Sequence, residues 1–232
     1  KVFASALEEN NVVETLILSC YAIVDDGAFA IGSVLGRNTS IQKLQLKDIR
    51  NVREITTFFQ LLQPNTSITE LSLRHCSICP RGAQAIAASL KEHAKLQEFR
   101  LTDSQLSGNS LCILCHGFKQ SKLQRLYLVN DDLAGAEDAR HLVDMLRDCE
   151  LRELYLSENE LGDEGVAVLA RGILAENQSL QHLDVRSNGI TSTSTLCLQG
   201  LMTGSLHLVG INVSNNDLSD LGATALARGL TN

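Results

Sequence analysis

The sequence predicts an α/β solenoid, a single elongated array in which every repeat contributes one strand and one helix. Three observations predict this fold. An apolar pattern of the form L-x-x-L-x-L occurs eight times in 232 residues, the successive occurrences begin 27 to 29 residues apart, and apolar residues at helical spacing separate them. A unit of this length cannot bury its own apolar face, so neighbouring units must stack on one another.

The eight strand patterns span residues 13–18, 41–46, 68–73, 96–101, 123–128, 151–156, 180–185 and 208–213. Side chains alternate between the two faces of a strand, so the fourth and sixth residues of each pattern, such as Leu154 and Leu156, point toward the helices. The fifth and seventh residues then point outward. Eight such strands predict a parallel sheet that lines the concave face of a horseshoe.

Helices are predicted on the convex face, because apolar pairs such as Leu142 with Leu146 and Leu169 with Ile173 recur at helical spacing between the strand patterns. Residues 2–7 resemble the tail of one more such helix. We therefore expect one array over residues 1–232, with eight units and a partial N-terminal helix. The last helix pattern, residues 223–230, has no polar cap behind it, and we expect the chain to be an excerpt of a longer protein.

The sixth unit, residues 151–161, reads Leu-Arg-Glu-Leu-Tyr-Leu-Ser-Glu-Asn-Glu-Leu and matches L-x-x-L-x-L-x-x-N-x-L at every fixed position. The chain thus resembles the leucine-rich repeats. Its unit length and full helices resemble the ribonuclease-inhibitor-like class, which includes sensor ends of nucleotide-binding immune receptors and Ran GTPase-activating proteins. The resemblance implies a binding protein without naming the partner. A ribonuclease-inhibitor role itself is disfavoured, because that resemblance implies tryptophan-rich inner contacts and the chain has no tryptophan.

The asparagine of this pattern is kept only in the last three units. The residues at this position, in chain order, are Tyr21, Ile49, Cys76, Ser104, Asp131, Asn159, Asn188 and Asn216. An asparagine amide there can bridge neighbouring turns. We therefore expect the N-terminal half of the array to be looser than the C-terminal half.

Composition favours a cytoplasmic protein that binds neither nucleic acid nor membranes. The net charge is −7, arising entirely in residues 117–232, and an acidic balance disfavours nucleic acid. No apolar run approaches the roughly 20 residues of a bilayer-spanning helix. Seven cysteines, an odd number, favour a reducing compartment. The sequons at Asn38, Asn65, Asn177 and Asn212 would permit glycosylation in a secreted protein, but three lie in helix-to-strand turns that need polar residues anyway.

Outward strand positions form the predicted binding face. Tyr127 and Tyr155 stand on adjacent strands, about 4.8 Å apart at the backbone, close to Arg74 and Arg100. Tyrosine and arginine are favoured in interface hot spots, although the rings could instead only pack on one another. Acidic residues near the ends of two neighbouring strands could steer a partner with a basic patch. The predicted partner-binding residues are Lys47, Arg74, Arg100, Tyr127, Asp131, Tyr155, Glu158 and Arg186.

No metal site, cofactor site or catalytic arrangement is predicted. The Cys-x-x-Cys pairs at 76–79 and 112–115 fall at different places in the repeat, so they do not converge as four zinc ligands must. The leading hypothesis is a non-enzymatic module that binds a protein on the concave face and adjoining loops. The alternatives are a Ran-type GTPase-activating protein acting through Arg50 or Arg53, and the ligand-sensing domain of a nucleotide-binding immune receptor. The oligomeric state stays open.

Overall fold

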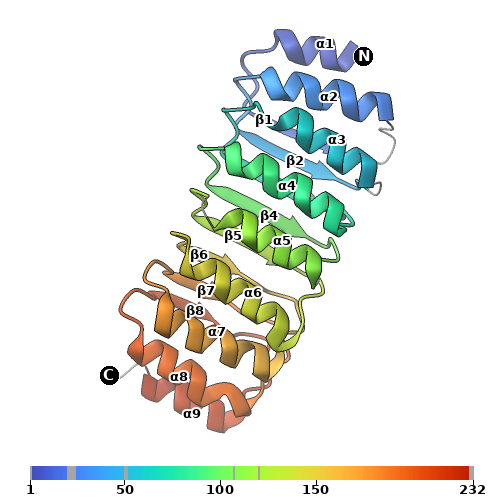
Figure 1. Ribbon diagram of the computed structural model, residues 1–232. Helices are drawn as coiled ribbons and strands as arrows, with labels where there is room; N and C mark the ends of the chain where they lie inside the picture. The colour runs from blue at the N-terminus through green and yellow to red at the C-terminus, as the bar shows by residue number, and fades with distance from the viewer. Residues whose placement is uncertain (1, 20–24, 50–51, 107, 120, 230–232) are drawn as a thin grey trace.

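The structure is a computed structural model that describes residues 2–19, 25–49, 52–106, 108–119 and 121–229. In these residues eight parallel strands form one sheet in chain order, and α-helices form a single layer over one face of that sheet (Figure 1). The two ends of the chain lie at opposite ends of the array. The predicted α/β solenoid is confirmed.

The strands are β1 (Thr15–Ser19), β2 (Lys43–Lys47), β3 (Glu70–Arg74), β4 (Glu98–Thr102), β5 (Arg125–Val129), β6 (Glu153–Tyr155), β7 (His182–Asp184) and β8 (Gly210–Asn212). The helices are α1 (Val2–Glu9), α2 (Asp25–Arg37), α3 (Val52–Leu62), α4 (Pro80–Glu92), α5 (Asn109–Phe118), α6 (Gly135–Arg147), α7 (Gly162–Glu176), α8 (Thr195–Gly204) and α9 (Ser219–Gly229), with a 3-10 turn at Ser192–Ser194 before α8.

Each strand begins two residues after the start of its sequence pattern. In the second to seventh patterns the first apolar residue, such as Ile41 or Ile68, is buried in the turn that leads from the helix into the strand. Its burial therefore anchors that turn and adds nothing to the sheet ladder. The ladder itself is in register, since Leu44 pairs with Leu71 and Leu71 with Phe99. A given position of the repeat thus forms a row along the sheet.

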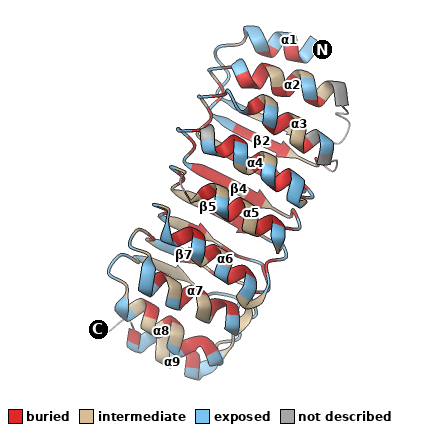
Figure 2. Cartoon of the chain, viewed as in Figure 1, coloured by how far each residue is buried: buried red, intermediate tan, exposed pale blue. Residues whose placement is uncertain are grey.

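The apolar core lies between the sheet and the helices (Figure 2). Leucines at the fourth and sixth positions of the patterns, together with helix residues such as Leu142 and Leu169, are buried there. Phe99 of β4 and Phe118 of α5 are also buried, and their ring centroids lie 5.3 Å apart. The outer surfaces of the helices are exposed, so each helix is amphipathic, as its sequence spacing predicts.

Asparagines hold the leading turns, defined here as the turns from a helix into the next strand. Asn65 donates from Nδ2 to the carbonyl oxygens of Leu35 and Asn38, at 2.6 and 3.0 Å, in the preceding unit. Its Oδ1 accepts from the backbone N–H groups of Ser67 and Ile68. Asn38 and Asn177 form the same kind of bridge. These three sequon asparagines therefore lie in helix-to-strand turns, as the sequence predicts.

The trailing turns, from a strand into the next helix, carry a second row of polar bridges. Asn159 donates from Nδ2 to the carbonyl of Leu128 at 2.8 Å and accepts at Oδ1 from the N–H groups of Asp131 and Leu133. Asn188 and Asn216 repeat this pattern. Because these bonds join one unit to its neighbour, the row fixes the spacing of the units.

Candidate protein-binding face

The concave face, meaning the side of the sheet opposite the helices, carries the third, fifth and seventh residues of each strand pattern. Along β5 the burial alternates strictly, with Leu126 and Leu128 buried and the outward residues partly exposed. Only the inward residues are needed for stacking. The outward residues are therefore free to serve a binding role.

Tyr127 and Tyr155 stack on one another at the middle of this face. They are direct partners in the β5–β6 register, and their rings are 4.2 Å apart and almost parallel, at 1°. The Tyr155 hydroxyl donates to Oε2 of Glu153 at 2.8 Å. Both tyrosines stay half-buried. The rings thus do pack together, and they still present surface to a partner.

Arg100 extends this stack by one strand. Its guanidinium carbon lies 3.7 Å from the centroid of the Tyr127 ring, which is the geometry of a cation–π contact. Arg100, Tyr127 and Tyr155 thus form one row across β4, β5 and β6, called here the aromatic row. Burial raises the pKa of both phenols, so the two hydroxyls stay neutral at physiological pH and can both donate and accept hydrogen bonds.

Glu98 fixes the arginine of the aromatic row, and sequence analysis missed it. This carboxylate of β4 is only 4 % exposed and accepts from Nε of Arg100 and, at 2.6 Å, from Nε of Arg125. Burial alone would raise the pKa of Glu98, but hydrogen bonds and charge from the two guanidiniums hold it below its usual value. Glu98 is the third residue of its pattern, and strict alternation along the strand predicts that this position belongs to the concave face. This alternation is the signal that could have identified Glu98 from the sequence.

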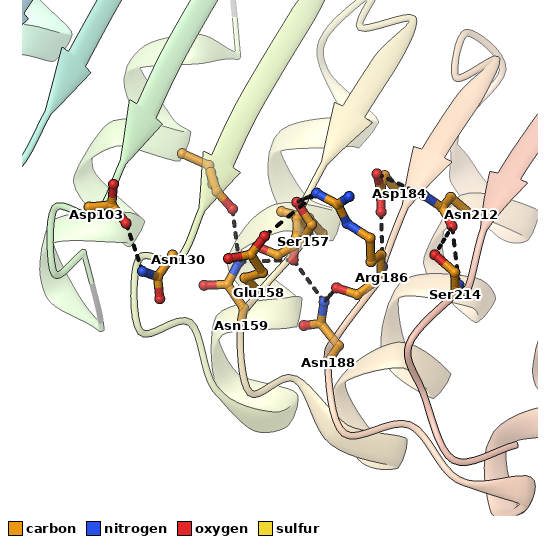
Figure 3. Close-up of polar contacts among 12 residues, drawn as sticks. Asp103, Asn130, Ser157, Glu158, Asn159, Asp184, Arg186, Asn188, Asn212 and Ser214 are labelled. Carbon is orange, nitrogen blue, oxygen red and sulfur yellow. Dashed lines mark hydrogen bonds and ion pairs between the residues drawn. The ribbon is translucent and has the colours of Figure 1, made fainter.

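Two of the basic residues predicted on this face, Lys47 and Arg74, lie side by side, and Arg74 forms an ion pair with an aspartate. Lys47 and Arg74 are direct neighbours in the β2–β3 register. Arg74 donates from Nε to Oδ2 of Asp103 at 3.1 Å, and Asp103 also accepts from the Asn130 amide at 2.7 Å. Asp103 and Asn130 follow β4 and β5 directly, at the rim of the face (Figure 3).

Glu158 and Arg186 come together at the same rim, across β6 and β7. Arg186 reaches Oε1 of Glu158 at 3.6 Å and Oγ of Ser157 at 3.4 Å (Figure 3). Glu158 is exposed and has φ of 61°. This left-handed backbone is uncommon for a glutamate. It recurs at the eighth residue of the other described strand patterns, as at Asp103 and Asn130.

Asp131 is the prediction that the structure overturns. It is fully buried and belongs to the trailing-turn row, so it cannot contact a partner. Its Oδ1 accepts from the N–H of Ser104 at 2.7 Å, and its own N–H donates to Oδ1 of Asn159 at 3.0 Å. Burial raises the pKa of this carboxyl to about 8, with a smaller contribution from the nearby charge of Asp103. A neutral carboxyl therefore substitutes for the asparagine amide of other units.

One cysteine of each Cys-x-x-Cys pair is part of the core. Cys76 is buried in the trailing-turn row, where its N–H donates to Oγ of Ser104 at 3.1 Å, and Cys115 is buried on the inner side of α5. Across the parts of the chain that the structure describes, no three His, Cys, Asp or Glu side chains are grouped as metal ligands would be. Nor does any described helix have the length and apolar character needed to cross a bilayer.

The arginines of the GTPase-activating alternative receive no support from the structure. Arg50 lies outside the described residues, and Arg53 is an exposed residue in the first turn of α3.

The acidic pair Asp163 and Glu164 lies in the first turn of α7, where a helix dipole favours negative charge. Asp163 also accepts from the N–H of Thr191 in the next unit, at 2.9 Å.

A shallow hollow of about 370 Å³ lies on the concave face directly beside the aromatic row. Residues of β1 to β4 line it, among them Ile17, Lys43, Glu70 and Arg100. Lys43 and Glu70 form an ion pair of 2.8 Å across its floor, and the Ile17 side chain is 56 % exposed. The hollow therefore offers an apolar wall and paired charges next to a cationic edge.

Comparison with known proteins agrees with this architecture. A family model described as "Leucine Rich repeat" matches residues 65–87, 148–170, 176–194 and 204–227. The ribonuclease inhibitor of Sus scrofa is 28 % identical over 94 % of this chain and 48 % of its own length. That of Mus musculus is 30 % identical over 73 % of this chain and 38 % of its own.

A third relative is much longer. "NACHT, LRR and PYD domains-containing protein 3" of Macaca mulatta is 30 % identical over 85 % of this chain, which corresponds to 20 % of its own length. The chain spans less than half the length of each of these relatives. Its in-register strands, its trailing-turn asparagines and these similarities together make it a leucine-rich repeat protein of the ribonuclease-inhibitor-like class.

Proposed function

We propose that this chain is a protein-binding module whose partner docks on the concave face, with the aromatic row as its anchor. The observation that carries the proposal is the stack of Arg100, Tyr127 and Tyr155 over three neighbouring strands. Such a row is not required by the repeat. A few aromatic and arginine residues near the centre of an interface commonly supply most of its binding energy.

The aromatic row is held in place before any partner arrives. Tyr155 is fixed by Glu153, Arg100 is fixed by Glu98, and the two rings support each other. Side chains that are already ordered lose little entropy on binding. The hollow beside Arg100 gives the partner's own side chain a place to insert.

Charge supports a partner with a basic patch at the C-terminal part of the face. Glu153 and Asp184 are partly exposed neighbours of Tyr155, and among the described side chains neither forms an ion pair. Glu158 stands at the adjoining rim. Carboxylates without an ion pair, such as Glu153 and Asp184, accelerate the approach of a cationic partner, and added salt weakens that effect.

An affinity-capture experiment tests the proposed face. The chain is immobilised, and the proteins that it retains from a cell lysate are quantified for the native chain, for Tyr127→Ala/Tyr155→Ala and for Phe29→Ala. Phe29 is an aromatic residue of α2, 56 % exposed and on the helical side, so it is the matched control. We expect the double variant to lose its specific partner by at least about tenfold and Phe29→Ala to retain it. Equal recovery of the partner by all three forms of the chain would refute the proposal that it docks on the concave face.

A second candidate function is the ligand-sensing end of a nucleotide-binding immune receptor. The observation that favours it is the third relative, whose name includes the word NACHT. That relative matches 85 % of this chain with 20 % of its own length. Both functions are compatible with a location in the cytoplasm. The six described cysteines form no disulfide bonds, which is typical of a reducing compartment. The complete coding sequence decides this candidate: a nucleotide-binding domain on the same polypeptide supports it, and a chain without one excludes it.

A further inference from the structure

The helical side of the molecule carries a second hollow, independent of the concave face. It has a volume of about 540 Å³ and lies between α4, α5 and α6, which are consecutive in the helical layer (Figure 1). We call it the α4–α6 pocket. Pockets that hold small molecules typically measure 300 to 1,000 Å³, so its volume suits a small ligand. A protein partner would need a contact area near 800 Å².

Small residues create this hollow. α4 presents Ala87 and Ala88 to it, and α5 presents Gly117. A Cβ atom at Gly117 would lie 2.5 Å from Cβ of Ala87, so only glycine permits α5 to pack this closely on α4. α5 is also shorter than its neighbours, with 10 residues against 13 in α4 and in α6. The outer ridge of side chains that covers an ordinary helix pair is therefore missing here.

The lining combines apolar side chains with a rim of basic residues. Ile113 and the two alanines supply the apolar part, and Lys91, His116 and His141 supply the basic residues. Asp144 also lines the pocket, and Lys119 lies between it and Asp148, with Nζ 2.8 and 3.2 Å from their Oδ2 atoms. Lys91 has no ion pair among the described side chains. Lys91 is therefore the lining cation that is left for an anion to pair with.

We propose that the α4–α6 pocket binds a small apolar monoanion, an aromatic or aliphatic carboxylate. The apolar part lies on Ala87, Ala88 and Ile113, and the carboxylate is held by Lys91 with a ring N–H of His116 or His141. A ligand with a single negative charge is preferred, because Lys91 is the pocket lysine that forms no ion pair with a described side chain. This site lies on the opposite side of the sheet from the proposed protein-binding face, so either can fail without the other.

Cys112 provides a reporter inside the pocket. It is a half-buried thiol of α5 that lines the cavity, whereas Cys197 is a half-buried thiol of the distant α8. The full chain is treated with N-ethylmaleimide, with and without 2-naphthoate, and alkylation of each cysteine is followed by peptide mass spectrometry. We expect 2-naphthoate to slow alkylation of Cys112 by about fivefold, because a pocket ligand is mostly buried, and to leave Cys197 unchanged. The uncharged analogue 2-naphthylmethanol protects less.

Three variants separate occupancy of the pocket from nonspecific binding. Ala88→Phe fills the hollow from an exposed helix position that tolerates a large residue, and Lys91→Glu reverses the charge at the rim. Arg171→Glu makes the same charge change on exposed α7, outside the pocket. Each protection factor is taken relative to the same variant without naphthoate. We expect the first two variants to lose protection and Arg171→Glu to retain it. Lack of protection in the native chain, equal protection by the alcohol, or protection that survives both pocket variants would each overturn the proposal.

Discussion

The two halves of this array use the same side chain to hold neighbouring units together, at one edge of the sheet in the N-terminal half and at both edges in the C-terminal half. In the described N-terminal half, Asn38 and Asn65 bridge leading turns. In the C-terminal half, Asn177 bridges a leading turn, and Asn159, Asn188 and Asn216 bridge trailing turns. An asparagine amide offers two donors and an acceptor in one plane, so it can join two backbone turns at either edge.

This difference changes the expected consequence of losing the consensus asparagine. The trailing-turn row continues through Asp131, Ser104 and Cys76, although none of these is an asparagine. Among the described residues of this row, only Ile49 is apolar, and Tyr21 of the first unit lies outside the described residues. We therefore expect the looser region to centre on the second unit.

Removing a trailing-turn asparagine should have the largest effect. Asn159→Ala leaves the N–H groups of Asp131 and Leu133 and the carbonyl of Leu128 without a partner in a fully buried site. We expect the free energy of unfolding to fall by about 3 kcal/mol, measured by urea denaturation. Gln178→Ala, at an exposed turn, is the control and should change little. A loss below about 1 kcal/mol would show that the row is not a main restraint.

Removing a leading-turn asparagine should cost somewhat less. Asn65→Ala strips two carbonyls of the preceding unit and the N–H groups of Ser67 and Ile68. Ser67 is only half-buried, so water can replace part of what is lost. We expect a loss of about 2 kcal/mol in the same urea measurement. If Asn65→Ala proves neutral, the two edges are not equivalent and the comparison fails.

Asp131 makes the middle of the trailing-turn row sensitive to pH. Its folded-state pKa of about 8 lies above the ordinary carboxyl value of 3.8, so the folded chain keeps a proton that the unfolded chain releases. Stability from this group is complete below about pH 4 and is lost as the pH rises from there through about 8.

Asp131→Asn should remove this pH dependence, because the amide cannot ionise. Urea midpoints of both proteins are compared at pH 5, 7 and 9, and the variant should gain most at pH 9. Glu150→Gln, at an exposed carboxylate that does not contribute to this shift, serves as the control and should follow the native chain. Parallel pH curves for the native chain and Asp131→Asn would mean that the buried carboxyl is ionised in the folded state.

Hydrogen exchange should detect the smallest difference, which lies between β2 and β7. Both strands have a leading-turn asparagine, Asn38 and Asn177, but only β7 has one in its trailing turn. We expect the amides at the trailing end of β2, residues 46–48, to exchange about tenfold faster than residues 185–187, because one more bridge must open in β7. Equal protection would show that burial of Ile49 fully replaces the amide.

The concave face shows how far the sequence reaches into the site. Adjacency of Tyr127 and Tyr155 is confirmed, since an in-register parallel sheet places equivalent positions side by side. Glu98 was missed because only two of the three outward positions of each pattern were considered. Asp131 was misjudged because aspartate is normally charged and exposed, and its burial depends on filling a position that other units give to asparagine.

The sequence by itself determined the repeat, the order of the strands and the rows of residues that face the same way, because a constant period becomes a spatial register once the units stack. Only the tertiary structure decided which of those residues pair. The guanidinium of Arg100 contacts the Tyr127 ring and the Glu98 carboxylate. The α4–α6 pocket results from the close packing of Gly117 on Ala87. Such contacts depend on rotamers and helix separation, which vary from unit to unit without altering the period.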